Sequence, residues 1–171
     1  MKNRHKSHLV FALFLLAGFL AAGSEAFAST FLKLDVAGLT ETSESVVQAR
    51  VVGSESAWNA RGSMIFTNVT LDVIRTIHGR SQDRIVVRVP GGTVGDRTLQ
   101  VEGASQFPAA GPVVSFVGEW PDGAAKVIGY FQGLSQIVPD GRGNQVLRGG
   151  SADGLTLQSF TEQVQQAGRG R

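Results

Sequence analysis

One segment of the chain alternates between apolar and polar residues over an unusual length. Ile65, Thr67, Val69, Leu71, Val73 and Ile77 share one parity, whereas Asn68, Thr70, Asp72 and Thr76 share the other. Successive side chains of a strand point to opposite faces, so this pattern predicts a half-buried β-strand. At about 3.3 Å per residue the strand would be about 40 Å long. A strand of that length has to curl in a small domain, as strands do in small closed barrels.

Shorter apolar runs on either side predict further strands. These are expected at 45–52, 85–89, 98–101, 113–118, 126–130, 135–138 and 145–147. The polar stretch 53–62, which contains Trp58, is expected to be a loop. Pro90-Gly91-Gly92 is expected to end one strand, because proline cannot donate to a ladder.

Turn and helix signals organise the rest of the chain. Pro121-Asp122-Gly123 and Pro139-Asp140-Gly141 are good turn sequences, and they predict that the last four strands form a meander. A helical turn or two is expected within 29–42. Leu157, Phe160 and Val164 lie at helical spacing and predict a short C-terminal helix before a frayed Gly-Arg-Gly-Arg tail.

Together these elements predict an all-β fold. Many short strands and one long bent strand favour a small Greek-key barrel of the OB type with short terminal helices. A β-sandwich is the alternative. The chain has no internal repeat or low-complexity linker, so residues 29–171 are expected to form a single domain.

The N-terminus has the three parts of a cleavable secretory signal. Lys2, Arg4 and Lys6 precede an apolar run over 9–22, and Ala26-Phe27-Ala28 places small residues at the cleavage positions. The run is shorter than the roughly 20 residues of a spanning helix. We therefore expect residues 1–28 to be removed and the protein to be exported, to a periplasm or out of the cell, with no membrane association after cleavage.

Removal of this signal changes the charge balance. The signal holds three of the 16 basic residues and one of the 14 acidic residues, so the mature chain carries 13 of each. Nucleic-acid binding normally needs a clustered cationic surface, which these scattered arginines do not predict. The chain has no cysteine, which excludes disulfides, thiol chemistry and cysteine zinc sites.

No catalytic constellation emerges from the remaining residues. His78 is the one histidine left after processing, and it is read as an exposed turn residue. Loop carboxylates such as Asp122, Asp140 and Asp153 are typical of turns, although a glycosidase would also use two acids facing across a cleft. The sequence thus predicts no catalytic residue, no metal site and no cofactor.

Two tryptophans are the most suggestive surface candidates. Trp58 lies in a polar stretch and Trp120 precedes a turn, and tryptophan is enriched at binding hot spots. The competing interpretation is that each ring covers an open end of the barrel core. The segment Gly129-Tyr130-Phe131-Gln132-Gly133 is interpreted in the same way, with glycines that allow close backbone approach in a curled sheet.

Two segments carry a resemblance to a known family. Residues 45–52 followed by 66–79 resemble the opening strands of netrin/TIMP-type (NTR) domains, and the same stretch with Val89-Pro90-Gly91-Gly92 resembles a group of uncharacterised exported bacterial proteins. The resemblance implies an OB-like barrel. Inhibitory NTR members grip a protease zinc with the amine and carbonyl of an N-terminal cysteine. In this chain Ser29 would be the first residue after cleavage. Ser29, followed by Thr30 and Phe31, would then have to present its backbone amine and carbonyl to the zinc in place of the cysteine.

These observations favour a non-enzymatic exported binding module. Its partner is expected to be an extracellular protein, and the most specific form of this hypothesis makes that partner an extracellular protease. The expected binding residues are Ser29, Thr30, Phe31, Trp58 and Trp120. There are two alternatives. One is a hydrolase that acts on envelope or extracellular polymers with paired carboxylates, and the other is a small-ligand carrier with its site at the barrel mouth. The oligomeric state stays open.

Overall fold

The computed structural model describes residues 32–170, which form two helices, nine strands and two 3₁₀ turns. Ser29, Thr30, Phe31 and the expected signal 1–28 lie outside the described residues. The elements are α2 (Val36–Thr42), β1 (Ser45–Trp58), β2 (Ile65–Gly79), β3 (Arg84–Pro90), β4 (Gly92–Val94), β5 (Arg97–Leu99), β6 (Gly111–Glu119), β7 (Ala125–Val127), η1 (Tyr130–Gly133), β8 (Leu134–Pro139), β9 (Gln145–Arg148), η2 (Gly150–Ala152) and α3 (Leu157–Gly168).

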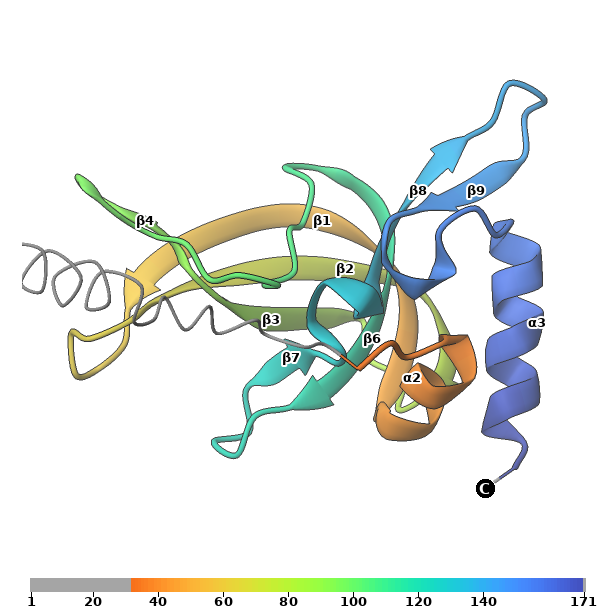
Figure 1. Cartoon of the computed structure of the whole chain (residues 1–171), viewed down its shortest axis with the longest axis horizontal. Coiled ribbons are helices and arrows are strands. Elements are labelled where there is room, and N and C mark those ends of the chain that lie inside the picture. The colour runs from red at the N-terminus through yellow and green to blue at the C-terminus, as the bar shows by residue number, and fades with distance from the viewer. Residues whose placement is uncertain (1–31, 171) are drawn as a thin grey trace, which may run out of the picture. The chain divides into compact units, whose positions relative to one another are not determined.

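Five of the strands close into a barrel (Figure 1). Their order is β1-β2-β3-β7-β6, and β6 pairs back onto β1 along 111–117. All these neighbours are antiparallel except β3 and β7, which are parallel. The predicted mainly-β barrel is confirmed, with a short helix near each end of the chain, and the alternative β-sandwich does not form.

The predicted long strand is confirmed as β2, and its partner β1 is longer than predicted. Shifts of register between Val46/Val47, Gln48/Ala49 and Val51/Gly53 bend the pair, which explains how two long strands wrap a small barrel. The loop predicted at 53–62 is wrong, because β1 continues to Trp58 and pairs with β2 there. Residues 53–58 are polar because both faces of this arm lie near solvent.

The meander predicted for the last strands is wrong as well. β7 and β8 pair with different parts of β6 rather than with each other, and β9 then pairs with β8. The strand expected at 126–130 ends at Val127, because Gly129 and Tyr130 both adopt left-handed backbone angles that a strand cannot contain. The strand stop at Pro90-Gly91-Gly92 is only partly correct, since Gly92 begins β4.

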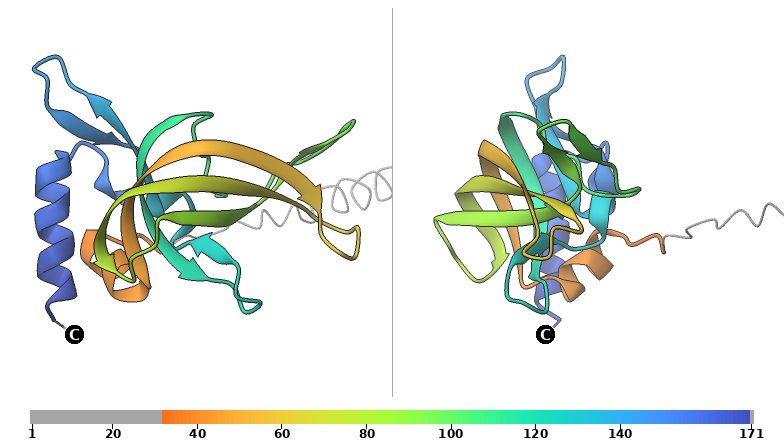
Figure 2. Two further views of the ribbon diagram at one scale, coloured as in Figure 1. Left: turned by 180° about the vertical axis from the view of Figure 1, so that it is seen from behind. Right: turned by 90° about the vertical axis from the view of Figure 1, so that its left-hand side faces the viewer.

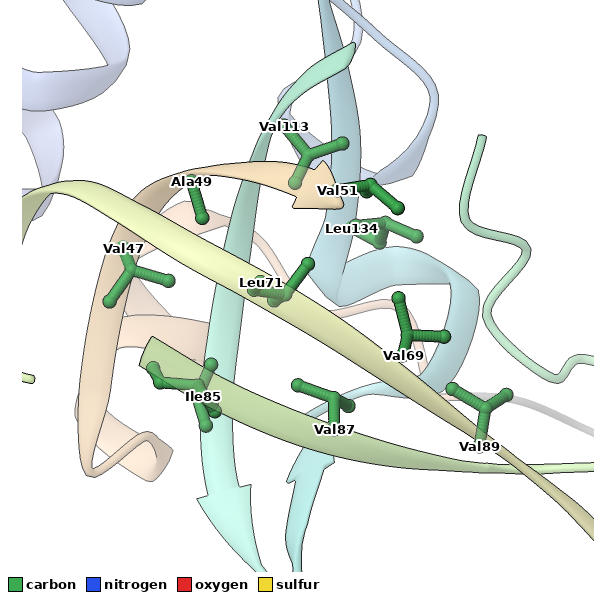
Figure 3. Packing of buried hydrophobic residues seen from close by; sticks show 11 residues of the cluster. Val47, Ala49, Val51, Val69, Leu71, Ile85, Val87, Val89, Val113 and Leu134 are labelled. Carbon is green, nitrogen blue, oxygen red and sulfur yellow. The ribbon is translucent and has the colours of Figure 1, made fainter. Parts of the chain in front are cut away.

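The core has two parts on opposite sides of the barrel wall. Figure 3 shows the barrel interior, which is filled by Val47, Ala49, Val51, Val69, Leu71, Ile85, Val87, Val89, Val113, Val117 and Leu134. The second part lies between the wall and the helices, and includes Val46, Leu39, Val114, Phe116, Phe160 and Val164. β6 is therefore buried on both faces over 113–118, as is the start of β1 at Val46 and Val47, which explains the mainly apolar sequence of these two segments.

The two helices lie together at one end of the barrel, and the turn between β1 and β2 lies at the other (Figures 1 and 2). The predicted C-terminal helix is confirmed as α3, whose first turn is capped by Thr156 through its Oγ1 and the Ser159 N–H, 3.1 Å apart. His78 was expected to be an exposed turn residue. It lies in β2, half-buried, with its ring against the backbone of Gly168 near the end of α3.

Candidate functional site

Trp120 is held in a fixed orientation directly after β6. Its indole Nε1–H donates a hydrogen bond of 3.3 Å to the carbonyl oxygen of Arg88 on β3. Its backbone closes the turn to β7, with N–H to Ala124 O at 2.8 Å. The Nζ of Lys126 lies 5.1 Å from the ring centroid, which is a cation–π distance. The half-buried indole is thus a rigid wall rather than a loose cover.

Trp120 lines a pocket where the barrel wall opens. β3 and β7 are paired at one position, Val87 with Ala125. The residues that follow on each strand are therefore not joined by β-ladder hydrogen bonds. The space between them has a volume of about 180 Å³. We call it the seam pocket, and it is lined by Arg88, Val89, Pro90, Ser105, Trp120, Lys126, Val127, Ile128, Gly129 and Tyr130.

Tyr130 forms the outer rim of the seam pocket at an energetic cost. Its φ of 57° is the one positive value among the non-glycine residues of the described chain. A left-handed conformation costs an L-residue roughly 1–2 kcal/mol. The residue is 45 % exposed, so part of its ring remains open to solvent at the rim. Strained backbone conformations of this kind cluster at ligand-contacting positions.

Gly129 explains how this rim is positioned. Its φ is 72°, and a Cβ at this position would lie 2.6 Å from Cδ2 of Leu39 in α2. The residue is therefore glycine both for its backbone angle and for its close approach to the helix. This contact fixes the start of η1 and, with it, Tyr130.

A second hollow lies between the β1–β2 turn and the β6–β7 turn. It has a volume of about 540 Å³ and is open to solvent. We call it the loop hollow, and it is lined by Ala57, Trp58, Asn59, Ala60, Arg61, Ser63, Phe66, Asn68, Arg88 and Asp122. Trp58 is 39 % exposed at its wall.

Arg88 connects the two hollows, because its side chain lines both. It forms an ion pair with Asp122, and its guanidinium carbon lies 5.8 Å from the centroid of the Phe66 ring. The Arg88 hydrogen bond, followed by one from the Ala124 N–H, lowers the pKa of the Asp122 carboxyl below its usual value. Asp122 is therefore ionised at neutral pH and holds Arg88 in place.

The structure thus places both predicted tryptophans on hollows that meet at Arg88, without bringing the two rings into one pocket. Sequence reasoning missed Arg88, Phe66 and Lys126. The outward parity of Phe66 and Arg88 on their strands was visible, but the parallel β3–β7 pairing that brings Arg88 beside Trp120 was not.

The loop carboxylates serve local structure. Asp140 accepts hydrogen bonds from the N–H groups of Arg142 and Asn144 and from Nδ2 of Asn144. Those bonds, the Asn144 side chain first, lower its pKa. Asp153 accepts from Gly149 N at 2.7 Å. Within residues 32–170, no three histidine or acidic side chains gather to hold a metal.

A third hollow lies at the barrel mouth. Its volume is about 230 Å³, and its walls come from the inner residues Val69 and Val89 and from the segment 99–109. Ser56 and Thr67 share a hydrogen bond of 2.9 Å beside it, and Thr67 also donates to Gly91 O. This is where a small-ligand carrier would hold its cargo.

Comparison of the chain with protein-family models, with curated proteins and with solved structures gives no match. Among residues 32–170, no helix has the length and apolar character needed to cross a membrane. Fold and site together define a small closed barrel of five mixed strands with flanking helices and an aromatic, cation-bearing surface on its outer wall.

Proposed function

We propose that the protein is an exported, non-enzymatic binding module that anchors an apolar side chain of a protein partner in the seam pocket. The observation that carries this proposal is the pocket itself: about 180 Å³, walled by rigid Trp120 and rimmed by strained Tyr130. An apolar cavity of about 150 Å³ takes a benzene ring, whereas sites for drug-sized ligands measure about 300–1,000 Å³. The size therefore suits one large side chain.

The surroundings favour a protein over a small molecule. Tryptophan, tyrosine and arginine are the residues most enriched at protein–protein hot spots, and all three border this pocket. Exposed Trp58 adds an aromatic side chain to the neighbouring loop hollow, which meets the seam pocket at Arg88. The order of the five barrel strands, with its single parallel pair, also supports the OB/NTR-like family that the opening strands resemble.

Site-specific photo-crosslinking tests this function. Tyr130 is replaced by p-benzoyl-phenylalanine, and Gln165 on the exposed face of α3 serves as the matched control position. In extracellular or periplasmic fluid of the source cells, we expect a discrete crosslinked protein from position 130 that the Trp120→Ala change removes. Equal crosslinking from both positions, or crosslinking that survives Trp120→Ala, would contradict the proposal.

Export and the protease version of the partner are tested separately. N-terminal sequencing of the exported protein should begin at Ser29; Met1 still in place would refute the cleaved signal. We then expect a complex with a secreted zinc protease if Ser29, Thr30 and Phe31 present their backbone atoms to the metal. If no enzyme in a panel of such proteases is inhibited or forms a complex, the hypothesis of a protease partner is refuted. The proposal that the seam pocket binds a protein would still stand, with a partner of another kind.

The barrel-mouth hollow supports a second candidate function. It lies at the end of the core, and its walls combine apolar residues such as Val69 and Val89 with polar residues such as Thr67, which suits a small molecule carrying both kinds of group. Native mass spectrometry of protein from its own host would reveal such cargo as an added mass. A spectrum of the bare polypeptide alone would count against the carrier function.

A further inference from the structure

We infer that the partner segment is acidic: a carboxylate next to its apolar anchor binds Arg88 in the place now taken by Asp122. This inference rests on the proposed function, because it concerns the same surface. It adds the chemistry of the partner, which the pocket volume alone does not give.

The first support is the charge of the two hollows. Their lining residues include three cations, Arg61, Arg88 and Lys126, and one carboxylate, Asp122. Complementary charge is the general rule across protein interfaces, where it also steers association. A partner that covers both hollows therefore meets an excess of positive charge.

The second support is the way Arg88 is held. Its carbonyl oxygen accepts the Trp120 hydrogen bond, and its guanidinium lies over the Phe66 ring. Of the five N–H donors of a guanidinium, Asp122 takes one at Nη1. The group is thus oriented in advance and retains donors for the planar, two-pronged contact that arginine makes with carboxylates.

The third support is that Asp122 is readily replaced. Its side chain is 59 % exposed, and that of Arg88 is 35 % exposed, so the ion pair is screened by water and contributes little to stability. Asp122 also keeps a second hydrogen bond, from Ala124 N to its Oδ1 at 3.2 Å, which holds the turn when Arg88 is released. An incoming carboxylate can therefore exchange with it at small cost.

Matched tripeptides test the inference by NMR on the exported, ¹⁵N-labelled protein. The probes are acetyl-Asp-Phe-Asp-amide and its neutral counterpart acetyl-Asn-Phe-Asn-amide, and the reporter is the Trp120 indole N–H. We expect the acidic peptide to bind about tenfold more tightly, the fold-change of one charge-assisted contact. The preference should vanish near 1 M salt, where the Debye length is about 3 Å.

Two variants test whether Arg88 and Asp122 are the cause of the preference for the acidic peptide. Asp122→Asn removes the competing carboxylate and keeps an oxygen for Ala124 N, so it should strengthen binding of the acidic peptide. Arg88→Gln should abolish the preference while the phenylalanine still shifts Trp120. Equal affinity for both peptides, or a preference that survives Arg88→Gln, would overturn the acidic partner and leave the proposed function standing. No Trp120 shift with either peptide would overturn both.

Discussion

The rings of Phe116 and Phe160 meet edge to face, with centroids 5.7 Å apart and planes at 82°. Phe116 comes from the outer face of β6 and Phe160 from α3, and both are buried. This contact joins the helix to the barrel wall through the second part of the core.

Removing the helix side of this contact should be costly. Phe160→Ala is expected to lower the free energy of unfolding by about 3–5 kcal/mol, because it deletes a buried ring and leaves a cavity. Gln165→Ala on the exposed face of the same helix should change it by less than about 0.5 kcal/mol. Urea unfolding followed by circular dichroism measures both. A loss below about 1 kcal/mol for Phe160→Ala would show that α3 contributes little to the core.

Ser115 faces the barrel interior with its hydroxyl unsatisfied. Its side chain is fully buried, and its Oγ has no hydrogen-bond partner within the described chain. We expect Ser115→Ala to raise the unfolding free energy by about 1 kcal/mol, since an unpaired buried hydroxyl is destabilising. Ser135→Ala is the matched control: this Oγ donates to Gly149 O at 2.6 Å, so its loss should destabilise. Equal destabilisation by both changes would contradict this account of Ser115.

Acid should destabilise the fold partly through Asp140. Hydrogen bonds to its carboxylate lower its pKa in the folded state. The resulting stabilisation is present above the unfolded pKa, about 3.9, and is lost as the pH falls through the lower folded value. The urea midpoint should therefore drop between pH 5 and pH 2 (about the range that brackets both values), and Asp140→Asn should drop less. An identical acid response of the variant would refute the role of this turn.

Tyr130 should matter more for binding than for stability. Tyr130→Gly relieves a left-handed backbone cost and removes a ring that is half exposed, so the two effects offset. We expect the unfolding free energy to change by no more than about 1 kcal/mol, while binding of the acetyl-Asp-Phe-Asp-amide probe is lost. Retained affinity in a stable variant would remove Tyr130 from the site.

The sequence predicts those helices and strands that bury one face and expose the other. The alternation over 65–77 and the helical spacing of Leu157, Phe160 and Val164 each report one apolar face, and both elements form as expected. The end of β1 escaped prediction because neither face of 53–58 is deeply buried, so its polar residues look like a loop.

The candidate site was only partly predictable for a different reason. Trp120 stands out in the sequence because it precedes a turn, but its role depends on Arg88, 32 positions away. What brings them together is a parallel pairing of β3 with β7 through Val87 and Ala125 alone. A pair that small leaves no periodic signal in the sequence. The strain at Tyr130 is likewise a backbone property that residue identity does not reveal.

The most direct test of the central claim is methyl NMR with N-acetyl-phenylalanine amide, which offers the protein one aromatic side chain. If the seam pocket is the anchor site, the Ile128 methyl groups and the Trp120 indole N–H shift together and saturably, and Trp120→Ala removes the effect. If the shifts appear instead at Leu99 and Val101 of the barrel mouth, with Ile128 unchanged, the account of this surface is wrong.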